Sequence, residues 1–299
     1  MLAFLLTQYL RQDKEPLLPF AIFKDRNYSS ITLVVAVVNF AILGLSLPLT
    51  IYLQSVLGLS AFEAGLTLLP QALISMLIVG SAGGLADRVG SKYILIGGLV
   101  LFATGMGYVD WIAEVNSGRW SFLPGLIVAG VGVGFTWTPL YNIAMRDVQP
   151  RVAGVAAGIF STIQELGGAI AGAAVGALLQ NRLAAAIQDE ATQRAGQLPS
   201  EFRDRFLDGF RQGTGDGVEF GTNQAAGGVQ ATPGMPARVA EQLEQLAEEI
   251  FKNAFVEAMH LTLILPIAVV LLAVISCFAV RQGKVKTRPE SIEQVEDAA

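Results

Sequence analysis

Long stretches without a charged residue alternate with short charged segments along this chain. No residue between Arg26 and Glu63 is charged, and the uncharged runs 64–86 and 93–109 lie on either side of a short polar segment. A run of about 20 apolar residues, rising roughly 1.5 Å each, crosses the hydrocarbon core of a bilayer. The pattern therefore predicts six transmembrane helices, at residues 31–54, 63–86, 93–113, 121–145, 152–181 and 261–280.

These helices predict an all-α fold, a polytopic membrane helical bundle in five parts. The parts are an amino-terminal helix remnant with a cytoplasmic linker (1–30), transmembrane helices 1–5 (31–181), a partly helical extracytoplasmic loop (182–256), transmembrane helix 6 (257–280) and a cytoplasmic tail (281–299). Apolar residues recur at helical spacing near both ends of the loop, which predicts a helical hairpin. They include Phe202, Phe206 and Phe210, and later Leu243, Leu246 and Ile250. For these ends we favour a helix lying on the membrane surface over a lid on a substrate site.

Lysine and arginine orient the predicted helices. Twelve of them lie on the segments that would share one side of the membrane, whereas the short outer loops carry only Arg119. Basic loops face the cytoplasm in most membrane proteins. Residues 1–30 and 281–299 are therefore expected in the cytoplasm, and the chain is expected to cross the plasma (inner) membrane several times.

Composition supports a membrane protein and argues against other classes. Hydrophobic residues make up 53% of the chain and charged residues 15%, which is typical of membrane proteins. The net charge of −5, without a basic stripe, argues against a nucleic-acid partner. The single cysteine, Cys277, forms no intrachain disulfide and no thiolate metal site, and we expect no cofactor. The single histidine, His260, is expected at the outer membrane interface.

The polar segment between the second and third spans predicts a ten-residue hairpin at the cytoplasmic face. It resembles the G-x-L-A-D-R-x-G-R-K loop signature of the major facilitator superfamily, with Ser91 in place of the usual basic residue. The matching positions are Gly83, Leu85, Ala86, Asp87, Arg88, Gly90 and Lys92. Residues 15–19, 64–70, 153–156 and 166–169 are similar to the fourteen-helix drug:proton antiporter family of the EmrB/QacA type.

This resemblance implies the carboxy-terminal half of a major facilitator fold. That half would consist of two inverted three-helix repeats, 31–113 and 121–280, with solute passing between it and an amino-terminal half. The implied function is export of amphipathic or cationic drug-like molecules against proton influx, and not an enzymatic activity. The implied partners are the bilayer, a small-molecule substrate, protons, and the missing amino-terminal half or a partner subunit. A truncated inactive product and a non-transporting membrane subunit remain as alternatives.

Polar residues within the spans are the candidates for function, because they are costly in lipid. Glu165 lies 12 residues after Ala153, about 18 Å into its helix and close to the midplane. We expect it to face the bundle interior and to exchange a proton for a cationic substrate; a structural hydrogen bond is the alternative. Relatives usually have Arg-Gln where this chain has Gln164-Glu165, so the carboxylate departs from the family pattern.

Four further residues are candidates for a substrate pathway. The amides of Asn39 and Gln71 lie within the hydrocarbon core, where hydrogen bonding between helices is as probable as substrate contact. Trp137 and Tyr141 are suited to a cavity for aromatic cations, or to anchoring at the inner interface. The resemblance places Gly83, Asp87, Arg88, Gly90 and Lys92 at a cytoplasmic seam between the two halves, with Asp87 facing a helix amino terminus.

Glycines in the fifth predicted span predict close helix packing. Gly154 and Gly158, and then Gly168, Gly172 and Gly176, recur at intervals of four, which places small residues on one face of a helix. The run Gly130–Gly134 is also expected inside a helix and not in a nucleotide-binding loop, because it lies within an uncharged stretch.

Overall fold

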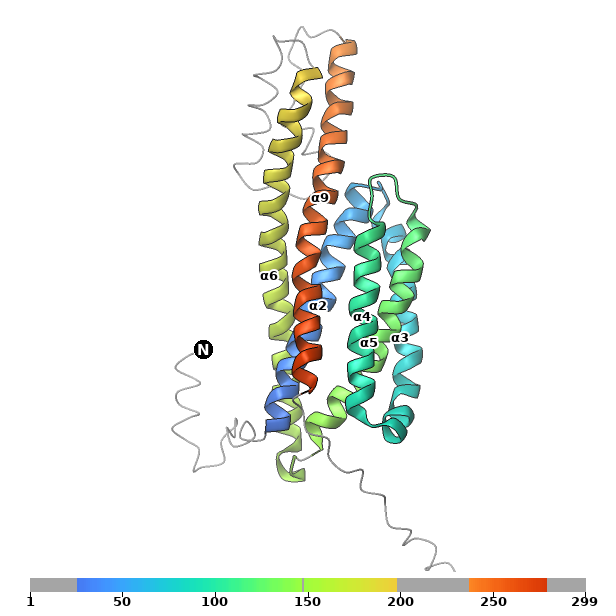
Figure 1. Ribbon diagram of the computed structural model, residues 1–299, viewed down its shortest axis with the longest axis vertical. Helices are drawn as coiled ribbons and strands as arrows, with labels where there is room; N and C mark the ends of the chain where they lie inside the picture. Colours follow the sequence, from blue (N-terminus) through green and yellow to red (C-terminus); the bar gives the residue numbers. More distant parts are fainter. Residues whose placement is uncertain (1–25, 147, 198–236, 279–299) are drawn as a thin grey trace, which may run out of the picture.

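A computed structural model describes residues 26–146, 148–197 and 237–278 of the chain (Figure 1). Six long helices are found in these residues: α2 (Arg26–Ser55), α3 (Ala61–Val89), α4 (Ser91–Ile112), α5 (Leu123–Met145), α6 (Ala153–Arg194) and α9 (Ala237–Phe278). Three short 3₁₀ helices accompany them: η2 (Arg119–Phe122), η3 (Pro150–Val152) and η4 (Ala195–Gln197). Each of the six long helices is long and apolar enough to cross a membrane. The predicted all-α bundle of six spans is therefore confirmed.

The helices pack in two groups, and each group contains helices from both predicted repeats. Helix α2 packs against α6 and α9, whereas α5 packs against α3 and α4, and α4 also contacts α9. Figure 1 shows α2, α6 and α9 on one side of the bundle and α3, α4 and α5 on the other. The first helix of each predicted repeat thus packs on the second helix of the other. The two three-helix segments are interlocked and share one core.

Glycine makes the contacts of α5 with α3 and α4 close. A Cβ atom at Gly130 would lie 2.6 Å from the carbonyl oxygen of Gln71 on α3, and one at Gly132 would collide with the backbone of Phe102 on α4. At Gly134 a Cβ atom would lie 2.7 Å from the Cβ of Ile78 on α3. The run Gly130–Gly134 therefore lies within a helix, as predicted, and its glycines alternate between two neighbouring helices.

The signature segment is shorter than the predicted ten-residue hairpin. Helix α3 continues to Val89 and α4 begins at Ser91, so that Gly90 alone separates them. Gly90 has a φ of 102°, which favours glycine because other residues meet a steric penalty there. The expectation of a loop at Asp87 and Arg88 is wrong: both belong to the last turn of α3. Polar residues there need no loop, because a helix can continue beyond the apolar core.

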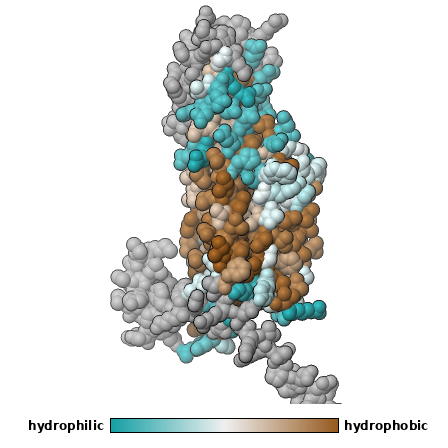
Figure 2. Space-filling model, viewed as in Figure 1, coloured by the Kyte–Doolittle hydropathy of each residue, from teal (hydrophilic) through white to brown (hydrophobic). Residues whose placement is uncertain are grey.

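The predicted boundaries at residues 181 and 257 do not break the helices. Helices α6 and α9 have 42 residues each, which corresponds to about 63 Å and exceeds the thickness of a bilayer. They extend together beyond the other helices in Figure 1, and Figure 2 shows a hydrophilic surface there above a hydrophobic band. The expected surface-lying helix is wrong for the described parts of the loop, which continue α6 and α9 directly.

In this extension the hydrophobic core of the bundle continues between α6 and α9, and an ionic contact joins the two helices. Its buried apolar residues are Leu183, Ile187 and Ala191 of α6 and Leu243, Ala247 and Ile250 of α9. Arg194 on α6 forms salt bridges with Glu190, at 2.9 Å, and with Glu249 on α9, at 2.8 Å. The two helices therefore pair along their outer parts, which agrees with the predicted helical hairpin. Phe202, Phe206 and Phe210, the remnant at 1–25 and the tail beyond 278 lie outside the described residues.

Candidate functional site

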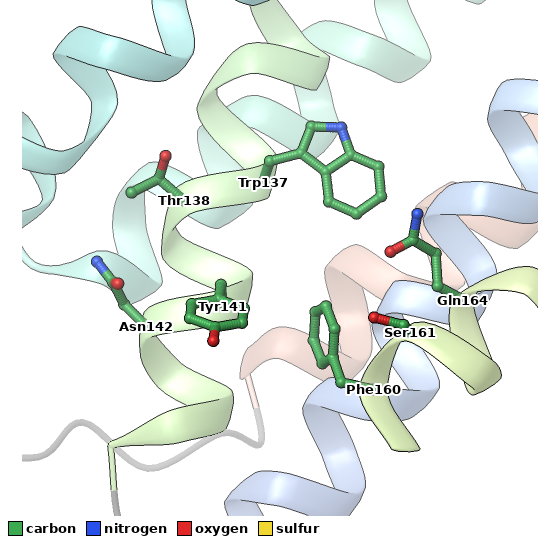
Figure 3. Close-up of a pocket in the computed structure, with 7 residues that line it drawn as sticks. All are labelled: Trp137, Thr138, Tyr141, Asn142, Phe160, Ser161 and Gln164. Carbon is green, nitrogen blue, oxygen red and sulfur yellow. The ribbon is translucent and has the colours of Figure 1, made fainter. Parts of the chain in front are cut away.

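A hollow of about 410 Å³ lies between α5 and α6 (Figure 3). It is present because α5 packs toward α3 and α4, while α6 packs toward α2 and α9, so that the two helices make few contacts with each other. Helix α5 supplies Trp137, Thr138, Tyr141 and Asn142, and helix α6 supplies Phe160, Ser161 and Gln164. The hollow thus unites the two aromatic residues predicted for a cavity with five lining residues that were not predicted.

The lining combines three aromatic rings with four neutral polar side chains. The rings of Tyr141 and Phe160 meet edge to face, with centroids 5.8 Å apart and an interplanar angle of 87°. In Figure 3 the indole of Trp137 extends from α5 toward α6, where the amide of Gln164 lies. Aromatic faces bind flat apolar groups or cations, and amides and hydroxyls can hydrogen-bond the polar edges of a ligand. The hollow therefore suits an amphipathic aromatic molecule.

Asn39 holds one wall of this hollow in place. Its Nδ2 donates a hydrogen bond of 2.7 Å to the backbone carbonyl of Gln164. Beside it, a Cβ atom at Gly167 would collide with the backbone of Ala36, and one at Gly168 would lie 2.7 Å from the Asn39 amide. The close approach of α2 and α6 makes this bond possible. Of the two alternatives for Asn39, the structure therefore supports hydrogen bonding between helices.

Gln71 is not brought to the hollow. It is a half-buried residue of α3 whose backbone carbonyl packs against Gly130 of α5. The residues that line the hollow come from α5 and α6, and Gln71 of α3 is not among them. Of the predicted pathway residues, Trp137 and Tyr141 line the hollow, Asn39 supports it, and Gln71 belongs to a packing contact.

Glu165 is exposed on the surface of the described bundle, and the expectation that it faces the bundle interior is wrong for this chain. The physical reason is that α6 buries another face, which includes Gly167, Gly168 and Ala171, against α2. Glu165 follows Ser161 by four residues, so the two lie on the same side of the helix, one turn apart. The carboxylate is thus one turn further outward than a residue that lines the hollow.

The predicted glycine stripe of α6 divides into two sets. Gly168 packs tightly against α2, whereas a Cβ atom at Gly154, Gly158, Gly172 or Gly176 would meet no atom within 4 Å. The latter four lie on the open side of α6, together with Glu165. The prediction of close packing is therefore wrong for these four within the described chain.

The signature residues lie where α3 ends and α4 begins. Asp87 and Arg88 are exposed, and Nζ of Lys92 donates a 2.8 Å hydrogen bond to the carbonyl of Phe278 at the end of α9. A Cβ atom at Gly83 would lie 3.6 Å from the methyl group of Thr138, which lines the hollow. Thr138 in turn donates a 3.2 Å hydrogen bond to the Val79 carbonyl of α3. The inner part of α3 therefore adjoins the hollow through one side chain.

The five lining residues that were not predicted could have been identified from their helical spacing. Thr138 and Asn142 are four apart on α5, next to Trp137 and Tyr141, and Phe160, Ser161 and Gln164 cover one turn of α6. Aromatic and polar residues recurring in this way inside uncharged runs indicate one face of each helix. Which two faces meet depends on how the helices pack, and the spacing of residues along the sequence does not determine this packing.

Comparison with known proteins matches this chain to one protein family and to several curated transport and resistance proteins. Residues 7–172 match the model of the family described as Major Facilitator Superfamily. An uncharacterized MFS-type transporter of Mycobacterium tuberculosis is 32% identical over 68% of this chain and 36% of its own length. The tetracenomycin C resistance and export protein of Streptomyces glaucescens is 29% identical, over 87% of this chain and 45% of its own length.

A multidrug resistance protein B homolog of Mycobacterium tuberculosis is 30% identical over 56% of this chain and 31% of its own length. The chain thus spans between 31% and 45% of the length of these three curated relatives.

Proposed function

Because the chain belongs to the Major Facilitator Superfamily, we propose that it is the carboxy-terminal half of a proton-coupled exporter of amphipathic or cationic drug-like molecules. The proposed transporter is of the fourteen-helix drug:proton antiporter type and acts in the plasma (inner) membrane. The observation that carries this proposal is the position of Glu165, one turn outward from an aromatic hollow on the open side of α6.

The hollow supports a substrate that is aromatic and amphipathic. Trp137, Tyr141 and Phe160 offer ring faces to a flat molecule, and a cation over such a face gains about 0.5–2 kcal/mol. Gln164 and Asn142 supply neutral hydrogen-bonding groups at its edges. Two relatives are named for multidrug resistance and for export of tetracenomycin C, which agrees with such a substrate.

Glu165 supports coupling to protons. A carboxylate near the midplane of a bilayer costs about 2.5–3.5 kcal/mol or more when it faces lipid. An exposed position on α6 is therefore unfavourable unless water, substrate or another protein surface covers it. In our proposal Glu165 faces the pathway, holds a proton when the cationic substrate is absent, and releases the proton when the substrate binds.

The open side of α6 also supports a second bundle as partner. Gly154, Gly158, Gly172 and Gly176 leave space for the backbone of a neighbouring helix to approach, and many apolar residues of α3 are exposed as well. The proposed partner is an amino-terminal half, because this chain spans only 31% to 45% of the length of these relatives. Alternating access would then come from one bundle rocking against the other.

The proposal is tested by replacing Glu165 with Gln in a transporter completed by an amino-terminal half. Gln keeps the shape and the hydrogen bonding of the neutral acid but does not titrate. We expect proton-driven efflux of ethidium from proteoliposomes to fall at least tenfold, or about 1.4 kcal/mol in activation free energy. The control is Glu257→Gln, which removes an exposed carboxylate at the outer part of α9. Unchanged rate and pH dependence in Glu165→Gln would contradict the proposal.

The same preparation distinguishes the alternatives. The purified chain alone is expected not to export the dye, and efflux by the chain alone would favour a parallel homodimer. No export by the completed transporter, with both halves folded in the membrane, would favour a truncated inactive product or a non-transporting subunit. The exporter would be favoured if the DNA upstream of the Met1 codon continues the reading frame and encodes further spans.

A further inference from the structure

We propose that Asp110 and His260 form a proton-binding site at the outer end of the contact between α4 and α9, and that external acidity strengthens this contact. Nδ1 of His260 on α9 lies 2.9 Å from Oδ1 of Asp110 on α4. The two side chains are 38% and 23% exposed, so protons from the outer solution can reach them. The site is separate from the hollow between α5 and α6 and does not depend on the proposed transport activity.

The position of the pair indicates which solution it samples. Asp110 lies 18 residues beyond Lys92, about 27 Å along α4, and therefore near the opposite membrane face from the signature segment. Helix α9 continues outward from His260 into the paired extension with α6. His260 is also the only histidine of the chain, and an unperturbed histidine titrates near pH 6.5. The pair is therefore placed to respond to the external pH in the physiological range.

The groups around His260 favour its protonated form. Asp110 of α4 and Glu114 of the loop after α4 are the charged groups that act on it, and the backbone of Ala113 also hydrogen-bonds it. Tyr52 of α2 holds this loop by donating a hydrogen bond to the carbonyl of Glu114. Helix α6 contributes none of the described contacts of His260. The imidazolium thus meets two carboxylates, and the neutral imidazole keeps only an ordinary hydrogen bond.

A second polar contact joins the same two helices at their other end. Nζ of Lys92 on α4 donates a 2.8 Å hydrogen bond to the carbonyl of Phe278 at the end of α9. A lysine at this position also interacts favourably with the negative end of the helix dipole. Between these two contacts α4 carries no charged residue, and its Leu99 and Met106 are buried. This inner contact does not involve His260, so the proposed dependence on external pH belongs to the outer contact alone.

Protonation of His260 would strengthen the contact between the two predicted three-helix repeats. Helices α4 and α9 belong to different predicted three-helix repeats, and α4 contacts α9 directly. A hydrogen bond between two charged groups is roughly twice as strong as a neutral one. When His260 is protonated, the outer ends of the two segments are held more tightly. This stabilisation is fully present when the pH is below the pKa of the imidazole, and it is lost as the pH rises through that pKa.

The test compares thermal unfolding of the purified full chain in detergent at pH 5.5 and at pH 8.5. In the wild type we expect the pair to add about 2–4 °C to the melting temperature at pH 5.5 over pH 8.5. His260→Gln and Asp110→Asn should each remove this pH-dependent difference, and the double variant should remove no more. Glu257→Gln should keep the difference. Lys92→Met should lower the melting temperature equally at both pH values.

A second measurement applies even if a variant unfolds too readily for melting curves. The single histidine gives one set of imidazole resonances, so NMR titration of isotope-labelled protein reports on His260 alone. Asp110→Asn should lower the midpoint of this titration, and Glu257→Gln, which removes a carboxylate three residues before His260 on α9, should change it much less. The proposal is overturned if His260→Gln keeps the wild-type pH dependence of melting, or if the titration is the same with and without the Asp110 carboxylate.

Discussion

The two sides of α5 differ in how closely neighbouring helices approach. Toward α4, Gly132 and Gly125 allow backbone contact, and Gly125 would bring a Cβ atom to 2.7 Å from the Tyr108 ring. Toward α6, Trp137 and Tyr141 project into the hollow, and the two helices make few contacts. One helix therefore has a face for packing and a face for a ligand.

The difference shows how a membrane protein separates rigidity from binding. Lipid is as apolar as a leucine side chain, so helices associate through close van der Waals packing and interhelical hydrogen bonds. The glycine side of α5 maximises such packing. The aromatic side leaves space that a partner molecule can fill, and it is bounded by a helix that packs elsewhere. The glycine contacts hold α5 in place while the hollow stays open.

The largest expected effect comes from adding one methyl group to the packing face. Gly132→Ala places a Cβ atom on the backbone of Phe102, and we expect a loss of about 1–3 kcal/mol or more in unfolding free energy. The matched control is Gly107→Ala on α4, where a Cβ atom meets nothing within 4 Å. That change should be neutral or stabilising, because alanine favours the helix by about 1 kcal/mol. Equal thermal stability of the two variants would contradict the distinction between the faces.

An intermediate effect is expected on the ligand face. Trp137→Leu removes the largest ring of the hollow and should weaken binding of ethidium about tenfold, close to the upper range of a cation over an aromatic face. Fluorescence titration of the purified chain measures the dissociation constant. Trp111→Leu, at an exposed tryptophan near the outer end of α4, is the control and should bind as the wild type does. A Trp137→Leu variant with unchanged affinity would show that the hollow does not bind such molecules.

The smallest effect is expected at the contact between α2 and α6 that supports the hollow. Asn39→Leu removes the hydrogen bond to the Gln164 carbonyl and should lower the unfolding free energy by about 0.6 kcal/mol, the average between membrane helices, and by no more than about 1.7 kcal/mol. Leu occupies a similar volume, so lost packing should contribute little. Dye affinity should fall by less than in Trp137→Leu, because Asn39 acts only through the position of Gln164. An affinity loss larger than that of Trp137→Leu would instead make Asn39 a direct contact.

Much of the fold could be predicted from hydrophobic runs and basic segments. The six predicted spans match six helices, because a helix that crosses lipid must satisfy its backbone internally and must be apolar over about 20 residues. The ends were predicted less well. The helix α3 continues through Asp87 and Arg88 to Val89, and α6 continues to Arg194. Polarity marks where a helix leaves the apolar core and does not mark where the helix stops.

The candidate site was predicted only in part, because its residues come from helices far apart in the sequence. Trp137 and Tyr141 were identified from their aromatic character, but Phe160 and Gln164 became part of the site only when α5 and α6 were placed side by side. His260 was interpreted from the sequence as an interfacial residue, and only the structure places its Nδ1 2.9 Å from Oδ1 of Asp110, which is 150 positions away in the sequence.

What this sequence determined by itself is therefore a set of local choices, namely six helices that are long and apolar enough to cross a membrane. The tertiary structure alone decided which face of each helix is covered. Gly168 is buried against α2 while Gly172, one turn later, is open, and Glu165 points outward although it lies at the depth expected for a pathway residue. Helical periodicity assigns residues to faces, but which face meets a neighbour depends on packing energies summed over several helices at once.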